Sequence, residues 1–379
     1  MRIALVTAYF YPTSTGGTEK YVLNLAKNLL SENNEVHVIT TGESAPTEYI
    51  GIKVYYIPDE LSDDPDILFG IKAPNNVKDF RNLIRNNQYD LIHFHTLTPA
   101  FNTFHITEAK KLGSQIHFSA HVPGITCIHG DLMQFGQKAC DGLIKKHKCT
   151  ACYISKKGIN KPLSQLLGRV INYVGYPINI AGAVDRKRES IRILNQLCDK
   201  IYLFTNWQKE IFIANGFYSK KLSLTSQVLD KKLFPKNAGN KEIRNIGFVG
   251  RISHEKGLDI LINSFKAANR QDLNLHIAGI INELPYFEKL KKSTIRNANI
   301  HWETNLLPEK IIEFYQKIDL LIIPSITYET GPFVLFEALE NNIPVLANNL
   351  GDMHIWKNKG FDIKLYNNKK RLIKEISEF

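Results

Sequence analysis

Two glutamates in the last quarter of the chain carry the clearest chemical signal. Glu329 lies in a loop that also contains Gly331 and Pro332, and Glu337 follows in an apolar segment, with seven residues between the two glutamates. A loop carboxylate accepts hydrogen bonds from sugar hydroxyls, and an acidic side chain near a helix start can accept two ribose hydroxyls. The alternatives are helix capping for Glu329 and a surface position for Glu337. Apolar neighbours argue against a surface position, because a carboxylate among them needs partners.

A second segment combines two cations with glycines and reads Gly250-Arg251-Ile252-Ser253-His254-Glu255-Lys256-Gly257. It follows an apolar run typical of a buried strand and precedes a helical pattern at Leu258–Phe265. Arg251 and Lys256, five positions apart, can hold a diphosphate and neutralise the charge that grows on a leaving group. Taken alone, the segment also fits a solvated charged loop.

A third segment, Gly16-Gly17-Thr18-Glu19, lies between the first expected strand and the first expected helix. Bare glycines at a helix start let a phosphate approach backbone N–H groups, where the helix dipole also favours an anion. A tight turn explains the same residues. No Gly-x-Gly-x-x-Gly follows the first strand, which argues against a nicotinamide-dependent dehydrogenase.

Strand-like and helical patterns alternate along the whole chain, and this alternation predicts an α/β fold with parallel sheets. Apolar runs predict strands at Ile3–Thr7, Glu35–Thr40, Val54–Ile57, Leu91–His95, Ile116–Ala120, Lys200–Thr205, Ile246–Val249, Leu273–Ala278, Asn299–Trp302, Leu320–Pro324 and Ile343–Ala347. A chain of 379 residues suits two such domains.

The polar segment 230–241, which carries Pro and Gly and has no periodicity, is the expected linker. We therefore predict Rossmann-like, doubly wound domains at 1–232 and 240–379, with a ligand cleft between them. After Gly360 only one short amphipathic pattern remains, so the second domain is expected to be the smaller.

In combination, these segments resemble the retaining glycosyltransferases of GT-B fold, in the large family four, also called group 1. The resemblance covers nearly the whole chain and implies that Glu329 orients the transferred sugar and that Glu337 binds the ribose. It further implies that His121 lies near the donor sugar, where a buried histidine satisfied by the backbone is the alternative. The other implied donor contacts are Gly16 and Gly17 with the phosphates, Arg251 and Lys256 with the diphosphate, and Gly250, Gly331, Pro332, Phe333 and Val334 around them.

The sequence departs from the family pattern in two places. After Ile343–Ala347 the family has a Gly-Gly pair and a glutamate, whereas this chain reads Gly351-Asp352-Met353. The family's final helix, which crosses back to the first domain, has no counterpart here.

The resemblance implies transfer of a hexose or N-acetylhexosamine from a nucleotide diphosphate sugar, such as a UDP-sugar, to a saccharide or lipid-linked acceptor. It implies retention of the anomeric configuration, no metal ion in catalysis, and a place in bacterial polysaccharide or lipopolysaccharide synthesis. Two alternatives stay open: a nucleotide-sugar epimerase or hydrolase of the same fold, and a catalytically silent nucleotide-sugar-binding protein. Asp63-Asp64-Pro65-Asp66 looks like the metal-binding Asp-x-Asp of the other glycosyltransferase fold, but it follows no strand and is expected to be a solvated turn.

Four of the five cysteines fall in a lysine-rich insertion at about 123–157, at Cys127, Cys140, Cys149 and Cys152. The closing Cys-x-x-Cys suggests a structural zinc ion held by four thiolates, which would order the loop. Four reduced thiols are the alternative. Cys198 is expected in the core.

The formal charge of +11 calls for an anionic partner, and nothing resembles a nucleic-acid-binding module. No run approaches the length that spans a bilayer, and the first ten residues fit a buried strand better than a signal peptide. We therefore expect a cytoplasmic enzyme, at the cytoplasmic face of the membrane if it docks there. The segment Leu163–Ile180 is a candidate amphipathic contact with anionic lipid, and core packing is the alternative.

Overall fold

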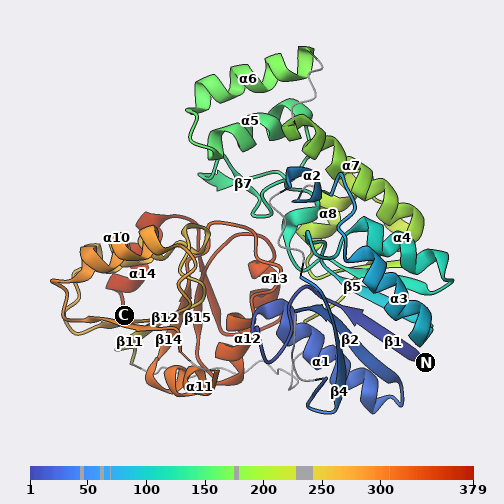
Figure 1. Ribbon diagram of the computed structural model, residues 1–379. Helices are drawn as coiled ribbons and strands as arrows, with labels where there is room; N and C mark the ends of the chain where they lie inside the picture. The colour runs from blue at the N-terminus through green and yellow to red at the C-terminus, as the bar shows by residue number, and fades with distance from the viewer. Residues whose placement is uncertain (43–46, 60–63, 69, 175–178, 228–241, 307) are drawn as a thin grey trace. The chain divides into compact units, whose positions relative to one another are not determined.

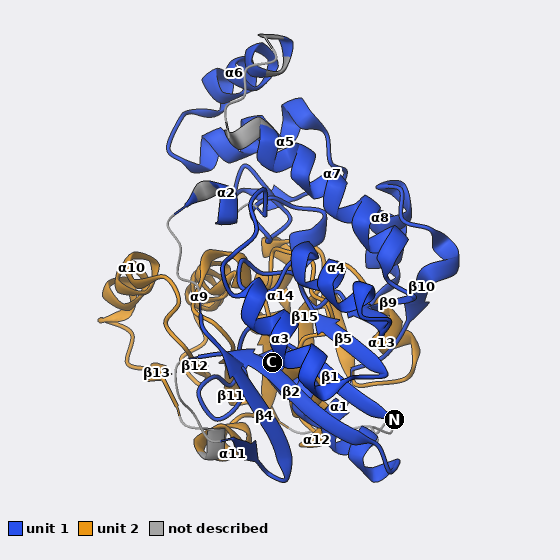
Figure 2. Cartoon of the chain, turned by 45° about the vertical axis from the view of Figure 1, so that its right-hand side comes forward, with its two compact units in different colours: residues 1–230 blue, residues 231–379 orange. Residues whose placement is uncertain are grey.

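The computed structural model describes residues 1–42, 47–59, 64–68, 70–174, 179–227, 242–306 and 308–379. The chain forms two compact units, Met1–Asp230 and Lys231–Phe379, shown in Figure 2. The expected linker at 230–241 and both expected domain limits, 232 and 240, lie outside the described residues.

Unit 1 is built on an eight-stranded sheet with the order β10-β9-β6-β5-β1-β2-β4-β3. All neighbours pair in parallel except β3, which is antiparallel to β4. The strands are β1 Arg2–Val6, β2 Glu35–Thr41, β3 Glu48–Tyr49, β4 Ile52–Ile57, β5 Leu91–His95, β6 Gln115–Ser119, β9 Lys200–Leu203 and β10 Leu222–Leu224. The strands predicted for this half are confirmed, and among the strands of this sheet the sequence missed the short β3 and β10.

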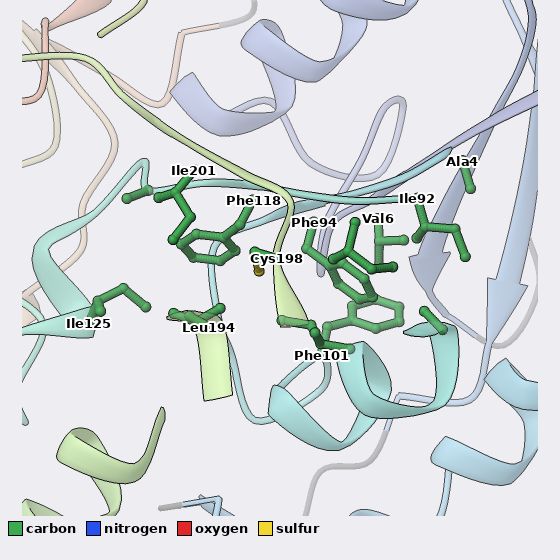
Figure 3. Close-up of a cluster of buried hydrophobic side chains, with 14 of the residues drawn as sticks. Ala4, Val6, Ile92, Phe94, Phe101, Phe118, Ile125, Leu194, Cys198 and Ile201 are labelled. Atoms are coloured by element: carbon green, nitrogen blue, oxygen red, sulfur yellow. The ribbon is translucent and has the colours of Figure 1, made fainter. Parts of the chain in front are cut away.

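Both faces of this sheet are buried, which explains why its strands read as continuous apolar runs. In β1, Ile3 and Leu5 belong to one apolar cluster, while Ala4 and Val6 belong to the other. Figure 3 shows the second cluster, in which Cys198 is buried as expected. The helices are α1 Gly17–Ser31, α2 Pro65–Leu68, α3 Val77–Asn87, α4 Thr103–Lys111, α5 Lys146–Lys156, α6 Lys161–Val174, α7 Asn179–Leu197 and α8 Asn206–Ala214.

A long insertion separates β6 from β9. It begins with a small hairpin of β7 Met133–Gln134 and β8 Lys138–Ala139, followed by the helices α5 and α6, which pack on each other. Gly168 of α6 lies so close to α5 that an added Cβ would be 2.7 Å from the carbonyl oxygen of His147. Ser164, one turn earlier, is fully buried. Two small residues on one face therefore let α6 approach α5.

Unit 2 has a six-stranded, fully parallel sheet with the order β13-β12-β11-β14-β15-β16. Its elements, most of which are labelled in Figure 1, are β11 Asn245–Val249, α9 Leu258–Ala268, β12 Asn274–Gly279, α10 Leu284–Thr294, β13 Ile300–Thr304, α11 Pro308–Lys317, β14 Leu320–Ile323, α12 Phe333–Glu340, β15 Val345–Asn348, α13 Met353–Asn358, β16 Ile363–Tyr366 and α14 Lys369–Ser377. The chain winds outward from β11 to one edge and then from β14 to the other, which is the order of a doubly wound fold.

The segment after Gly360 contributes more to unit 2 than the sequence predicted. It adds the edge strand β16, whose four residues are too few for a clear pattern, and it forms α14, which packs on α9. Leu372 and Ile376 of α14 are fully buried in the apolar cluster of this unit. The C-terminal segment is therefore part of the core.

We predict that Leu372→Ala destabilises unit 2 by about 2–5 kcal/mol, because it removes a buried side chain and leaves a cavity. The exposed Lys370→Ala on the same helix serves as the control and is expected to change stability by less than about 0.5 kcal/mol. Urea unfolding curves measure both. Equal stability of the two variants would contradict the role of α14 in the core.

Candidate functional site

The candidate site of unit 2 lies where its sheet reverses direction. β11 and β14 are neighbours, and the loops after their carboxyl ends contain the Arg251–Lys256 segment and Glu329. The two loops touch, since the N–H of Ile326 donates to the carbonyl of Glu255 at 3.0 Å. Ligands of doubly wound sheets bind at this position.

Gly257 makes this approach of the two loops feasible. Its φ is +68°, and a Cβ there would be 2.2 Å from the carbonyl oxygen of Pro324. Any other residue would be strained in this conformation and would also collide with the loop after β14. The glycine that closes the basic segment therefore keeps Lys256 beside the second loop.

Lys256 and Glu329 form an ion pair, with 2.6 Å between Nζ and Oε1. The hydroxyl of Ser325 donates to the same carboxylate oxygen at 2.6 Å. Burial raises the pKa of Glu329, but the combined effect of Lys256, Ser325 and the Arg251 charge is larger and lowers that pKa below its usual value. Glu329 is therefore a carboxylate at neutral pH and can accept hydrogen bonds from a ligand.

Arg251 remains largely exposed at this site. Its guanidinium lies 3.4 Å from the carboxylate of Glu255, and 57% of its side chain is accessible to solvent. The Arg251 charge also acts on Glu329, so the guanidinium lies near the Lys256–Glu329 pair, and its exposed side can meet an anion that reaches the loop. This is the charge arrangement that holds a phosphate group.

Glu337 lies on α12 and is partly buried, which contradicts the alternative of a plain surface position. Its Oε2 accepts a hydrogen bond of 2.9 Å from the hydroxyl of Tyr315 on α11. Burial, together with the charge of Glu337, raises the pKa of Tyr315 well above its usual value, so this hydroxyl remains a donor. The segment Gly331-Pro332-Phe333-Val334 forms the start of α12, between the two glutamates.

In unit 1, Gly16 is the N-cap of α1, as the glycine pair predicted. The carboxylate of Glu19 folds back over this helix end, where it accepts a hydrogen bond of 2.7 Å from Ser14. A Cβ on Gly16 would be 2.5 Å from Oε2 of Glu19, so the glycine also makes room for this carboxylate. The expected contact of Gly16 and Gly17 with donor phosphates stays a prediction.

His121 follows β6 and is buried beside His95, the last residue of the neighbouring strand β5. Nε2 of His121 lies 3.0 Å from Nδ1 of His95. The rings of Tyr21 and Phe204 each pack 4.7 Å from the ring of His121. Burial lowers the pKa of His121 to about 3 and that of His95 well below its usual value. Both rings are therefore neutral at physiological pH, and a single proton is shared between these two nitrogens.

The structure brings Lys256, Arg251 and Glu329 together and gives Glu337 a buried partner. Sequence reasoning missed three residues that hold these groups: Ser325, Tyr315 and His95. Ser325 lies four residues before Glu329 in the same motif, so the sequence itself indicated that the two residues are near each other. Nothing in the sequence indicated that Tyr315 on α11 would reach Glu337, because 22 residues separate them.

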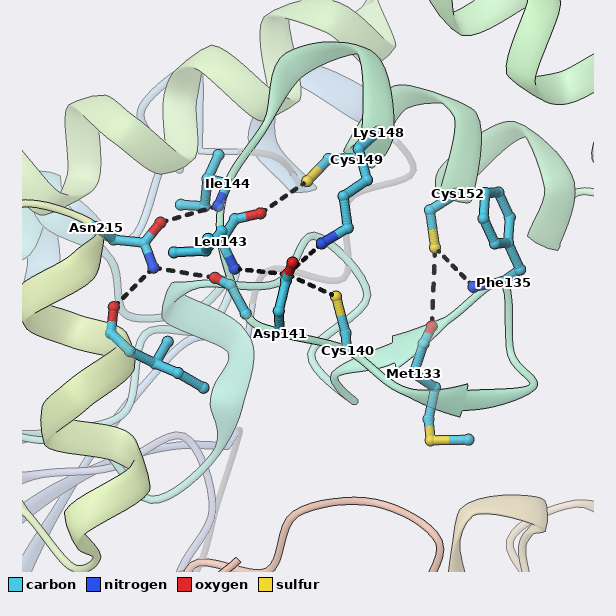
Figure 4. A network of polar contacts seen from close by, with 12 residues as sticks. Met133, Phe135, Cys140, Asp141, Leu143, Ile144, Lys148, Cys149, Cys152 and Asn215 are labelled. Carbon is cyan, nitrogen blue, oxygen red and sulfur yellow. Dashed lines mark hydrogen bonds and ion pairs between the residues drawn. The ribbon is translucent and has the colours of Figure 1, made fainter.

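The cysteines of the insertion contact backbone and aspartate groups, as Figure 4 shows for three of them. Sγ of Cys152 accepts the N–H of Phe135 at 3.2 Å, and Sγ of Cys149 lies 3.9 Å from the carbonyl of Leu143. Burial raises the pKa of Cys149 to about 11, so it is a thiol here. Within the described ranges, no three His, Cys, Asp or Glu side chains are grouped as metal ligands. Zinc binding by Cys127, Cys140, Cys149 and Cys152 stays a prediction.

In the described part of the segment that resembles an Asp-x-Asp site, Asp64 directly precedes the short helix α2 and Asp66 lies in its first turn, so a helix starts where a turn was expected. Asp64 accepts the backbone N–H of Asp66 at 2.9 Å and the ammonium of Lys72 at 3.4 Å. Asp63 lies outside the described residues. Along the described residues, no helix is both long enough and apolar enough to cross a membrane.

We predict that unit 1 loses stability as the pH falls from about 6.5 toward 3, because the unfolded chain then binds protons that the buried histidines exclude. The loss is about 1.4 kcal/mol per histidine and pH unit. Burial also lowers the pKa of His105 to about 3, so His105→Gln should reduce the pH slope by about one proton. Hydrogen exchange in the strands of unit 1 at several pH values measures the slope. An unchanged slope in the variant would be the contrary result.

Two family models match the chain. The model described as Glycosyltransferase Family 4 matches residues 15–151, and the model described as Glycosyl transferases group 1 matches residues 230–377. An uncharacterized 42.6 kDa protein in the cps region of Klebsiella pneumoniae is 25% identical over 93% of this chain and 86% of its own length. An uncharacterized glycosyltransferase of Methanocaldococcus jannaschii is 24% identical over 93% of this chain and 82% of its own.

Among solved structures, that of HepE from Anabaena in complex with UDP and glucose matches with a TM-score of 0.65 and 14% identity. The match covers 100% of this chain and 89% of that one. This likeness shows the fold, which is GT-B. The chain belongs to the glycosyltransferases of these two matched families, Glycosyltransferase Family 4 in unit 1 and Glycosyl transferases group 1 in unit 2.

Proposed function

We propose that the protein transfers a hexose or N-acetylhexosamine from a nucleotide diphosphate sugar to a saccharide or lipid-linked acceptor, with retention of the anomeric configuration. The observation that carries this proposal is the Lys256–Glu329 ion pair beside the exposed Arg251, at the reversal point of the sheet in unit 2. Two cations and a carboxylate at one position suit a ligand with a diphosphate at one end and a hydroxyl-rich sugar at the other.

In this proposal, Arg251 and Lys256 stabilise the negative charge that grows on the diphosphate as the bond to the sugar loosens. Charged groups already in place cost no reorganisation during the reaction. Glu329 is ionised and accepts hydrogen bonds from the sugar hydroxyls, while Glu337, fixed by Tyr315, accepts those of the ribose. The acceptor attacks on the face that the diphosphate leaves, and the leaving phosphate takes its proton. No protein base is then required.

His121 has a restricted role in this scheme. Because burial lowers its pKa to about 3, the ring is neutral in the physiological range and is not a general acid. A neutral imidazole can still exchange a hydrogen bond with a sugar hydroxyl. The backbone N–H groups at Gly16 and Gly17, at the start of α1, are proposed to bind the phosphates.

The relatives support the proposal at the level of substrate class. HepE was solved with UDP and glucose, which makes UDP-sugars the first donors to test. The Klebsiella pneumoniae relative comes from a cps region, which supports a role in the synthesis of a bacterial cell-surface polysaccharide or lipopolysaccharide. Such an enzyme would act in the cytoplasm and would require no metal ion for catalysis.

We predict that Lys256→Ala and Arg251→Ala each lower kcat more than tenfold, since each removes a charged contact of about 2–4 kcal/mol from the transition state. Lys289→Ala, an exposed cation on α10, is the matched control and should retain the activity of the unchanged protein. Turnover with nucleotide sugars, chosen from a thermal-shift screen, measures the effect. Near-normal turnover in both site variants would refute the diphosphate role.

Donor consumption without any acceptor separates the transferase from an epimerase or hydrolase. An epimerase or hydrolase converts the nucleotide sugar alone, whereas a transferase needs the acceptor. A silent sensor raises its melting temperature with the donor yet turns over none of the acceptors supplied.

A further inference from the structure

The helix α6 exposes a face of large apolar side chains that nothing in the described structure covers. Four residues, three or four positions apart, share this outer face: Leu163, Leu166, Val170 and Tyr173. Their exposed fractions are 46%, 58%, 48% and 93%. Spacing of this kind places side chains along one side of a helix.

A different side of α6 packs on α5. Ser164 is fully buried, and Gly168 lies against His147 and Ala151 of α5. Figures 1 and 2 both show α6 as the outermost helix of the insertion, with α5 beneath it. The outer face of α6 is thus additional to the packed face, and core packing does not explain it. Exposed apolar patches of this kind mark interaction sites.

The charges around this face have one sign. From residue 142 to residue 184 the sequence contains seven Lys and Arg residues and no Asp or Glu. Three of these lysines pair with acids outside that range: Lys146 with Asp185, Lys148 with Asp141 and Lys156 with Asp131. The exposed Lys145, Lys157, Lys161 and Arg169 have no carboxylate partner among the described residues.

We propose that the outer face of α6 docks the protein on an anionic lipid leaflet. An amphipathic helix lies in the membrane interface when apolar side chains enter the acyl boundary and flanking cations meet anionic headgroups. Tyr173, at the last turn of α6, is an aromatic residue of the type enriched at that interface. Aliphatic, aromatic and cationic side chains together fit a lipid surface, whereas a second copy of the chain would bring like charges together.

The test uses flotation of the full-length protein with vesicles of phosphatidylcholine, with and without phosphatidylglycerol. The unchanged protein should float with the anionic vesicles and much less with the neutral ones. Leu166→Gln/Val170→Gln/Tyr173→Gln should weaken binding at least about tenfold. Lys157→Gln/Lys161→Gln/Arg169→Gln should lose most of the preference for anionic vesicles.

The matched control is Ile213→Gln/Lys220→Gln, which replaces an apolar and a cationic residue exposed elsewhere on unit 1, and it should float like the unchanged protein. Melting temperatures verify that the variants are folded. If the triple variant unfolds, the single variant Tyr173→Gln replaces it in the test, because Tyr173 is nearly fully exposed.

Absence of flotation, or equal flotation of the apolar variant and the control, would overturn the proposal. So would a dimer in size-exclusion chromatography that dissociates on Leu166→Gln/Val170→Gln/Tyr173→Gln while no vesicles are bound. The assay contains no nucleotide sugar, so its outcome is independent of the proposed transferase activity.

Discussion

The ion pair between Lys256 and Glu329 is the interaction on which the candidate site depends. It joins the loop after β11 to the loop after β14. These two strands are neighbours at the point where the strand order of unit 2 reverses direction. The approach requires Gly257, since a side chain there would meet the carbonyl of Pro324. Backbone geometry and charge thus act together. The Glu329 carboxylate stays ionised in a largely buried position because the Lys256 ammonium and the Ser325 hydroxyl stabilise it.

The corresponding end of the sheet in unit 1 is organised by a different kind of interaction. His95 and His121 are buried at the carboxyl ends of neighbouring strands and are neutral, because the cost of burying a charged imidazole exceeds any stabilisation near them. Aromatic rings of Tyr21 and Phe204 enclose them. The pair of His95 and His121 is therefore polar but uncharged, whereas Lys256 and Glu329 form a charged pair.

In the insertion between β6 and β9, helix α6 has two sides of different composition. Small residues on one side of α6 allow close packing with α5, while large apolar residues occupy another side that stays exposed. The absence of acidic residues from 142 to 184 gives the whole region one charge sign, so much of the excess of +11 is concentrated there. Two of the four cysteines of the insertion, Cys149 and Cys152, lie in this segment and contact backbone groups.

The sequence alone determined the parallel strands, the two-unit organisation and the local motifs, because apolar runs and glycine positions act over short distances along the chain. It placed Gly16 at a helix start and Lys256 and Glu329 in loops after strands, and the structure agrees. Only the tertiary structure decided which side chains meet. Tyr315 reaches Glu337 because α11 and α12 flank the same strand β14 in the chain and pack on one sheet, and His95 reaches His121 because β5 and β6 pair in register. Likewise, the apolar pattern of α6 fits a packed face and an exposed face equally well. Periodicity does not specify which elements lie next to a helix in space, and in the structure the neighbours of α6 leave one of its sides exposed.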